Sequence, residues 1–182
     1  MLKGKRISLI GPGVMGEALL SALLARAGVA AEDLTVGGPR PERLRELRER
    51  YGVMASTDNR AAVDRAEAVV LSVKPQTLPG VLEGLSGAIP PGALVLSIVA
   101  GARLEDLSRK LGHPALVRAM PNTPAQIGQG ITVWAARPAV SEELKEMARQ
   151  TLACLGSEVY ADDEDYLDMA TTLAKYPNVK AT

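Results

Sequence analysis

The sequence contains no phenylalanine and has only one cysteine, one histidine and one tryptophan among its 182 residues. Because Cys154 is alone, an internal disulfide is excluded, and we interpret it as a buried helical residue. No apolar run approaches the roughly 18 residues that a membrane-spanning helix needs. The 21 basic and 21 acidic residues give a formal net charge of zero. The sequence therefore does not favour nucleic acid or an anionic membrane as a partner.

The sequence has enough hydrophobic residues to form a core, since they make up 47% of the chain. The charged start "MLKGKR" resembles that of a signal peptide, but Gly11, Pro12 and Gly13 interrupt the apolar stretch that follows. This interruption disfavours secretion. We expect a soluble, cytoplasmic protein with one sizeable domain that binds a small ligand, and we assign no metal site.

Short aliphatic runs alternate with helical patterns along the chain. The runs that we predict as strands are residues 7–10, 34–36, 53–55, 68–73, 94–98, 116–119, 131–135 and 158–160. The central runs are apolar at nearly every position, which is typical of parallel strands covered on both faces. The pattern predicts an α/β fold of the Rossmann type, doubly wound, with a mainly parallel sheet and helices on both faces.

Three segments between and after these runs carry helix signals. Residues 41–51 place leucines on one stripe and end at Gly52, and we interpret their charged residues as a solvated face. Ser141 precedes two glutamates and predicts the N-cap of a helix that ends near Gly156. Residues 162–173 predict one more helix, after which the pattern is lost.

The stretch "ISLIGPGVMGEALL" has the spacing G-x-G-x-x-G between a predicted strand and a predicted helix. In this context Gly11 permits the tight turn, Gly13 lets a pyrophosphate approach the backbone, and Gly16 lets helix and strand pack closely. The N–H groups that begin the helix face the phosphates. The alternative is an ordinary strand-turn-helix corner that contains glycines. We favour dinucleotide binding.

The end of the second predicted strand, "TVGGPRPERL", bears on which dinucleotide is bound. An NAD site commonly has an acidic residue here to hold the ribose hydroxyls, and none is present. Gly37 and Gly38 leave room, and Arg40, helped by Arg43, could pair with a 2′-phosphate. The sequence favours NADP, with NAD as the other possibility. The alternative is that both arginines simply face solvent at the start of a helix.

Ligands of a doubly wound sheet lie beyond the carboxyl ends of its strands, where three later loops stand out. The first is "VKPQ", in which Lys74 sits at a strand tip and Pro75 can start a helix. The second, "SIVAGA", has small residues that would let a ligand ring lie against the backbone. The third, "RAMPNTPAQIGQG", is either a structural elbow or a rigid loop that presents polar groups.

Taken in order, these motifs, together with "NRAAV" at Asn59 and "DEDYLDMATTL", closely resemble the N-terminal half of pyrroline-5-carboxylate reductase. The likeness runs from about residue 5 to about residue 173. The resemblance implies hydride transfer from NAD(P)H to the C=N bond of 1-pyrroline-5-carboxylate, giving proline. It also implies a small imino-acid substrate and leaves the oligomeric state open, a homo-oligomer included.

The resemblance further implies which residues hold the cofactor. They are Gly11, Pro12, Gly13, Val14, Met15 and Gly16 at the pyrophosphate; Gly38, Arg40 and Asn59 at the adenosine ribose and its phosphate; Val73, Lys74 and Pro75 at the nicotinamide ribose; Ala100 and Gly101 at the ring; and Asn122 and Thr123 where ring and substrate meet. No side chain is an obvious proton donor. We interpret His113 as a residue of a surface loop.

The ending "AKYPNVKAT" departs from the family pattern, in which a serine- and glycine-rich segment leads into a long helical domain that forms the dimer. We therefore expect a dinucleotide-binding domain over residues 1–160, then the start of a helix and an atypical, frayed tail over residues 161–182. We expect NADPH binding with little turnover. Two other interpretations are a non-catalytic NADP(H)-binding module, acting as a sensor or partner subunit, and a related imine or hydroxyacid reductase.

Overall fold

The computed structural model describes residues 2–167. Eight strands form a single sheet: β1 (Ile7–Ile10), β2 (Leu34–Gly37), β3 (Met54–Ser56), β4 (Ala68–Leu71), β5 (Leu94–Ser97), β6 (Leu116–Pro121), β7 (Gly130–Ala136) and β8 (Gly156–Tyr160). The α-helices are α1 (Val14–Arg26), α2 (Pro41–Tyr51), α3 (Asn59–Val63), α4 (Leu78–Leu85), α5 (Leu104–Leu111) and α6 (Glu142–Ala153). Three short 3-10 helices are η1 (Ala31–Asp33), η2 (Pro75–Thr77) and η3 (Thr123–Ile127).

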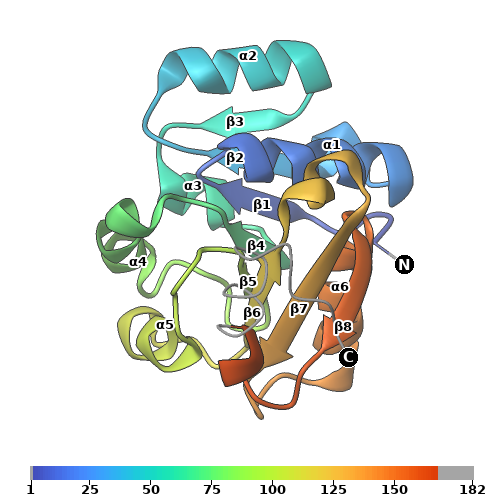
Figure 1. Cartoon of the computed structure of the whole chain (residues 1–182). Coiled ribbons are helices and arrows are strands. Elements are labelled where there is room, and N and C mark those ends of the chain that lie inside the picture. The colour runs from blue at the N-terminus through green and yellow to red at the C-terminus, as the bar shows by residue number, and fades with distance from the viewer. Residues whose placement is uncertain (1, 168–182) are drawn as a thin grey trace.

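The strand order is β3-β2-β1-β4-β5-β6-β7-β8 (Figure 1). Strands β1 to β6 are mutually parallel, β7 is antiparallel to β6, and β8 is parallel to β7. The predicted doubly wound fold with a mainly parallel sheet is confirmed, and each of the eight predicted runs contributes a strand. The fourth run is shorter than predicted, because the chain leaves the sheet after Leu71, and the sixth extends to Pro121.

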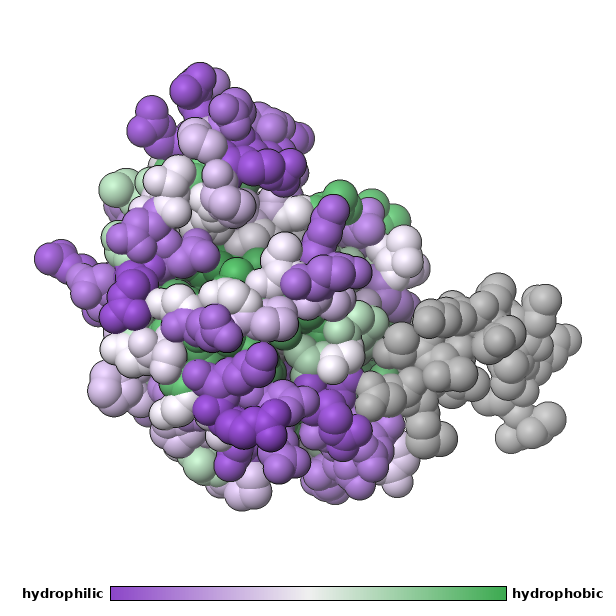
Figure 2. Space-filling model, turned by 90° about the vertical axis from the view of Figure 1, so that its left-hand side faces the viewer, coloured by the Kyte–Doolittle hydropathy of each residue, from purple (hydrophilic) through white to green (hydrophobic). Residues whose placement is uncertain are grey.

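The sheet has a hydrophobic core on each face, as the unbroken apolar character of its central strands requires. One core contains Leu19, Leu20 and Leu23 of α1, Leu44 and Leu47 of α2, and Met147, Ala148 and Leu152 of α6. The other contains Val63 of α3, Leu82 and Leu85 of α4, and Leu107 and Leu111 of α5. The face of the molecule turned to the viewer in Figure 2 is largely hydrophilic, with hydrophobic residues mainly in its central part.

The helix boundaries follow the local signals. Helix α2 begins with Pro41 and ends at Gly52, which adopts the left-handed conformation at φ +72°. The Ser141 hydroxyl accepts a hydrogen bond from the backbone N–H of Leu144 and so caps α6, as predicted. Cys154 directly follows α6 and is buried, which confirms its predicted burial.

Past β8, residues 165–167 are helical, and the rest of the helix predicted over residues 162–173 lies outside the described residues. The predicted division at residue 160 stays a prediction. Within residues 2–167, no helix is long and apolar enough to cross a membrane.

Candidate functional site

A cleft of about 340 Å³ lies where the carboxyl ends of β1, β2 and β4 meet. The strand order reverses between β1 and β4, so the cleft occupies the position at which doubly wound sheets bind ligands. Its lining residues follow the three strands: Gly11, Pro12, Gly13, Gly38, Pro39, Arg40, Arg43, Leu44, Ser72, Val73, Lys74 and Thr77. Seven of the sequence-predicted site residues are therefore brought together: Gly11, Pro12, Gly13, Gly38, Arg40, Val73 and Lys74.

The glycines of the first turn differ in what surrounds them. Gly11 has a φ of +82°, and a Cβ atom there would lie 2.8 Å from the Cα atom of Val73. A Cβ atom on Gly16 would lie 2.6 Å from the Ser72 hydroxyl. On Gly13, by contrast, the nearest atom would be 4.0 Å away. Gly11 and Gly16 are thus required by the fold, whereas the bare backbone at Gly13 leaves space for a ligand.

The turn leads directly into α1, which begins at Val14. Gly13 is the N-cap of α1 and, having no side chain, provides no capping hydrogen bond. The first N–H groups of a helix have no partner within the helix, and together with the helix dipole they attract an anion. The Ser72 hydroxyl donates to the carbonyl oxygens of Gly11 (2.8 Å) and Ile10 (3.2 Å), which fixes the turn from the β4 side. The turn thus has both the shape and the polarity of a phosphate site.

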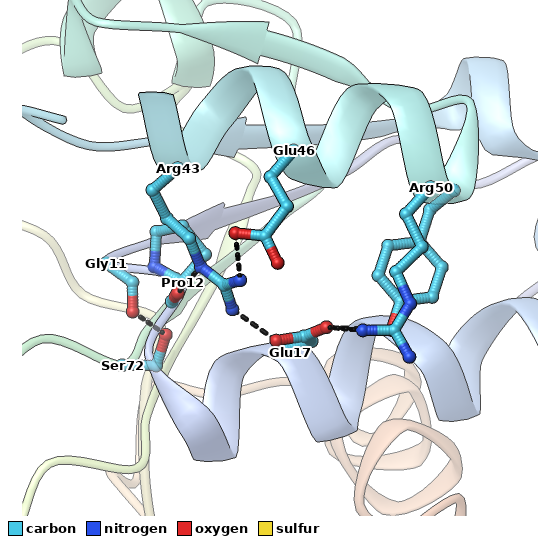
Figure 3. Close-up of polar contacts among 8 residues, drawn as sticks. Gly11, Pro12, Glu17, Arg43, Glu46, Arg50 and Ser72 are labelled. Atoms are coloured by element: carbon cyan, nitrogen blue, oxygen red, sulfur yellow. Dashed lines mark hydrogen bonds and ion pairs between the residues drawn. The ribbon is translucent and has the colours of Figure 1, made fainter. Parts of the chain in front are cut away.

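Arg40 and Arg43, which the sequence groups together, have different environments. Arg40 lines the cleft at the N-cap of α2, and its exposed side chain has no hydrogen bond or ion pair within residues 2–167. Arg43 is engaged by its neighbours (Figure 3): it pairs with the Glu17 and Glu46 carboxylates and donates through Nε to the carbonyl oxygen of Pro12. Of the two, only Arg40 has its guanidinium free to bind a ligand.

Asn59 is the first residue of α3 and does not line the cleft. A Cβ atom on Gly37 would lie 2.9 Å from Asn59 Oδ1, so the two residues pack closely. This oxygen is buried and has no hydrogen-bond partner in the described structure.

The loop after β4 presents a cation at the cleft. Lys74 is exposed, and its carbonyl oxygen accepts hydrogen bonds from the Thr77 hydroxyl (2.9 Å) and backbone N–H (3.0 Å). Pro75 starts η2, as predicted. The backbone is therefore held while the ammonium group stays available to an anion.

The remaining predicted residues lie farther along the same sheet edge, past β5 and β6. Ala100 and Gly101 are exposed, and a Cβ atom on Gly101 would meet nothing within 4 Å. Asn122 precedes η3, and its Oδ1 atom accepts a hydrogen bond from the backbone N–H of Ile131 (2.9 Å). Thr123 is exposed at the start of η3. These four residues do not line the cleft, and neither do Val14, Met15, Gly16, Asn59 and Pro75.

Sequence reasoning missed four residues that line the cleft: Pro39, Leu44, Ser72 and Thr77. Ser72 and Thr77 flank the "VKPQ" segment, and hydroxyl residues beside a strand end are a signal that could have found them. The prediction that His113 belongs to a surface loop is wrong. His113 is 5% exposed, and its Nε2 atom lies 2.8 Å from the carbonyl oxygen of Ala93, which precedes β5.

The family model described as "NADP oxidoreductase coenzyme F420-dependent" matches residues 6–101. The pyrroline-5-carboxylate reductase of Synechocystis is 37% identical over 166 residues, which are 91% of this chain and 61% of that protein. The enzyme of Pseudomonas aeruginosa is 36% identical over 170 residues, 93% of this chain and 62% of that protein. The chain thus spans about six-tenths of the length of these curated relatives.

Solved structures agree with this fold. A pyrroline-5-carboxylate reductase from Coxiella burnetii superposes with a TM-score of 0.89 at 29% identity, covering 95% of this chain and 65% of that one. The Plasmodium falciparum enzyme with NADP bound has a TM-score of 0.82 at 22% identity, covering 95% and 63%, and shows the fold alone. The resemblance inferred from the motifs is confirmed. Because the family model matches more than half of its residues, the chain belongs to the family of NADP oxidoreductases described as coenzyme F420-dependent.

Proposed function

We propose that this chain binds NADP(H) in the cleft and forms the nucleotide-binding part of a pyrroline-5-carboxylate reductase. In this reaction hydride passes to the C=N bond of 1-pyrroline-5-carboxylate and gives proline. The observation that carries the proposal is the open space at Gly13, where a Cβ atom would lie 4.0 Å from its nearest neighbour. Gly13 also begins a helix that has no side-chain cap. A pyrophosphate fits such a turn because it needs close backbone approach and free N–H donors.

The charges of the cleft support the phosphate-bearing dinucleotide. Its lining includes three cations, Arg40, Arg43 and Lys74, and no carboxylate. Arg40 is the one whose position after β2 and free guanidinium suit a 2′-phosphate, since β2 has no acidic residue at its end to hold ribose hydroxyls. We therefore assign NADP in preference to NAD.

The nicotinamide ring of the bound cofactor would supply the hydride, and the residues of this chain would bind and orient it. Lys74 and Val73 line the cleft after β4, the central strand next to β1, and we assign them to the nicotinamide ribose. Ala100 and Gly101 follow β5, and Asn122 and Thr123 follow β6. We assign Ala100 and Gly101 to the ring, and the amide of Asn122 and the hydroxyl of Thr123 to its border with the substrate.

Binding and hydride transfer are tested separately. Titration of the protein with NADPH and with NADH, followed by nucleotide fluorescence, should give a markedly lower dissociation constant for NADPH. The loss of NADPH absorbance on addition of pyrroline-5-carboxylate then tests turnover. Absence of affinity for either dinucleotide would refute the assignment of the cleft.

One observation favours a second candidate, a dinucleotide-binding module without catalysis. The four residues assigned to the ring and to its border with the substrate carry no carboxyl, imidazole, thiol or ammonium group, so none of them is an acid that could protonate an imine near neutral pH. Tight NADPH binding together with no proline formation would support this candidate. A partner subunit, a homo-oligomer and a cytoplasmic location stay predictions.

A further inference from the structure

Glu17, in the first turn of α1, is surrounded by three donors from α2 (Figure 3). Its carboxylate pairs with the Arg43 guanidinium, accepts from Arg50 Nη1 at 2.9 Å and accepts from the Tyr51 hydroxyl at 2.9 Å. The side chain of Glu17 is 19% exposed, so these contacts are partly shielded from water. Helix α2 is thus connected by charged hydrogen bonds to the helix that begins at the cleft.

The negative charge of Glu17 lies in the first turn of α1, where it would repel an anionic ligand at the same helix terminus. A carboxylate in the first turn of a helix interacts favourably with the dipole, but a second anion at the same terminus is repelled by it. Burial alone raises the pKa of Glu17, but hydrogen bonds from Arg43 and Tyr51 outweigh burial and the net pKa is lowered. Glu17 is therefore ionised at neutral pH, and a pyrophosphate at Gly13 would approach an existing negative charge.

Arg43 connects this carboxylate to the cleft itself. It lines the cleft, its Nε donates to the Pro12 carbonyl oxygen at 3.3 Å, and the two ends of its guanidinium pair with Glu17 and Glu46. Its side chain is 20% exposed. All three nitrogens of Arg43 thus have partners on the protein, whereas Arg40, three residues earlier on the same rim, has no hydrogen bond or ion pair within the part of the chain that the structure describes.

We propose that Arg43 is a positioning residue for the pyrophosphate: it neutralises Glu17 and holds Pro12 of the glycine turn, while Arg40 alone distinguishes NADPH from NADH. This inference rests on the proposed dinucleotide site. The two arginines thus have different roles: Arg43 affects the binding of both dinucleotides, and Arg40 affects only the binding of the 2′-phosphate.

Four variants test the division: Arg43→Gln, Glu17→Gln, the double variant, and Arg40→Gln as the matched control. Dissociation constants for NADPH and NADH are measured by isothermal titration calorimetry, with thermal unfolding of each free protein as the structural readout. Arg43→Gln should raise both constants by about tenfold, the size of one charge-assisted hydrogen bond. Glu17→Gln should leave both within about threefold of wild type, and the double variant should recover most of the loss.

The outcomes separate the inference from the function on which it rests. A loss confined to NADPH in Arg43→Gln would show that Arg43 contacts the 2′-phosphate and would overturn the proposed role. An unchanged affinity in that variant, whatever its thermal midpoint, would also overturn it, as would a double variant no better than Arg43→Gln. If wild-type protein binds neither dinucleotide, the proposed function itself fails.

Discussion

Gly11 and Val73 approach so closely that a Cβ atom on Gly11 would lie 2.8 Å from the Val73 Cα atom. The turn after β1 and the loop after β4 are therefore packed backbone against backbone. Gly13, two residues later, has no such neighbour. The same motif thus contains two glycines that the fold needs, Gly11 and Gly16, and a third, Gly13, whose bare backbone leaves space for a ligand.

Alanine substitutions should separate these two requirements. Gly11→Ala should lower the free energy of unfolding by more than about 2 kcal/mol, because it combines a positive φ with overlap against Val73. Gly13→Ala should cost only about 1 kcal/mol or less, as expected for an alanine N-cap, yet weaken NADPH and NADH alike. Urea unfolding and fluorescence titration measure both effects. Full dinucleotide affinity in Gly13→Ala would mean that no phosphate lies at this turn.

Arg40→Ala tests the cofactor preference. If the guanidinium pairs with the 2′-phosphate, NADPH binding should weaken by about 1 to 3 kcal/mol and NADH binding should barely change. Arg45→Ala is the matched control, because Arg45 is also exposed on α2 but does not line the cleft. Equal weakening of both nucleotides in Arg40→Ala would contradict the assignment.

His113 should make stability depend on pH. Burial lowers its pKa below 6.5, and its Nε2–H donates to the carbonyl oxygen of Ala93. The unfolded chain binds a proton more readily, so the contribution is fully present above about pH 6.5 and is lost as the pH falls through the folded-state pKa. NMR titration of this single imidazole gives that pKa directly. A value at or above 6.5, or an identical pH profile for His113→Gln, would contradict this account.

Glu164 should matter far more for stability than Asp165 beside it. Glu164 pairs with Arg118, which is 1% exposed on β6, and accepts a hydrogen bond from the backbone N–H of Leu104 at the start of α5. Glu164→Gln weakens the pairing of a buried charge and should cost about 2 to 4 kcal/mol. Asp165→Asn, which affects the exposed pair with Arg103, should cost about 0.5 kcal/mol or less. Denaturant unfolding of both variants gives the comparison, and similar values would refute it.

The sequence predicted the parts of the fold that depend on local pattern. Alternating apolar runs located every strand, and the glycine spacing located the cleft because both are properties of a few consecutive residues. His113 was misplaced because "LGHPA" has the composition of a surface loop, and its burial depends on the segment before β5, twenty residues away.

The same limit applies to the charged residues of α2. Their pattern indicates a solvated face, and most of them are exposed, but Arg43 turns toward α1 and pairs with Glu17. That contact joins residues 26 positions apart, and only the packing of the two helices determines it. Arg118 was placed on a strand correctly, but nothing in its neighbours indicates that Glu164 would meet it.

In the connection between β6 and β7, a hydrogen bond from the backbone of β7 determines how the Asn122 side chain is oriented. The amide oxygen of Asn122 accepts the backbone N–H of Ile131, which fixes the orientation of the side chain; its NH₂ group can donate to a ligand, and the oxygen keeps a second lone pair. A ligand group with a lone pair, such as a carboxamide oxygen or a carboxylate, can accept a hydrogen bond from this NH₂ group. The direction in which Asn122 presents its donors is therefore determined by a backbone contact of the fold and does not depend on a bound ligand.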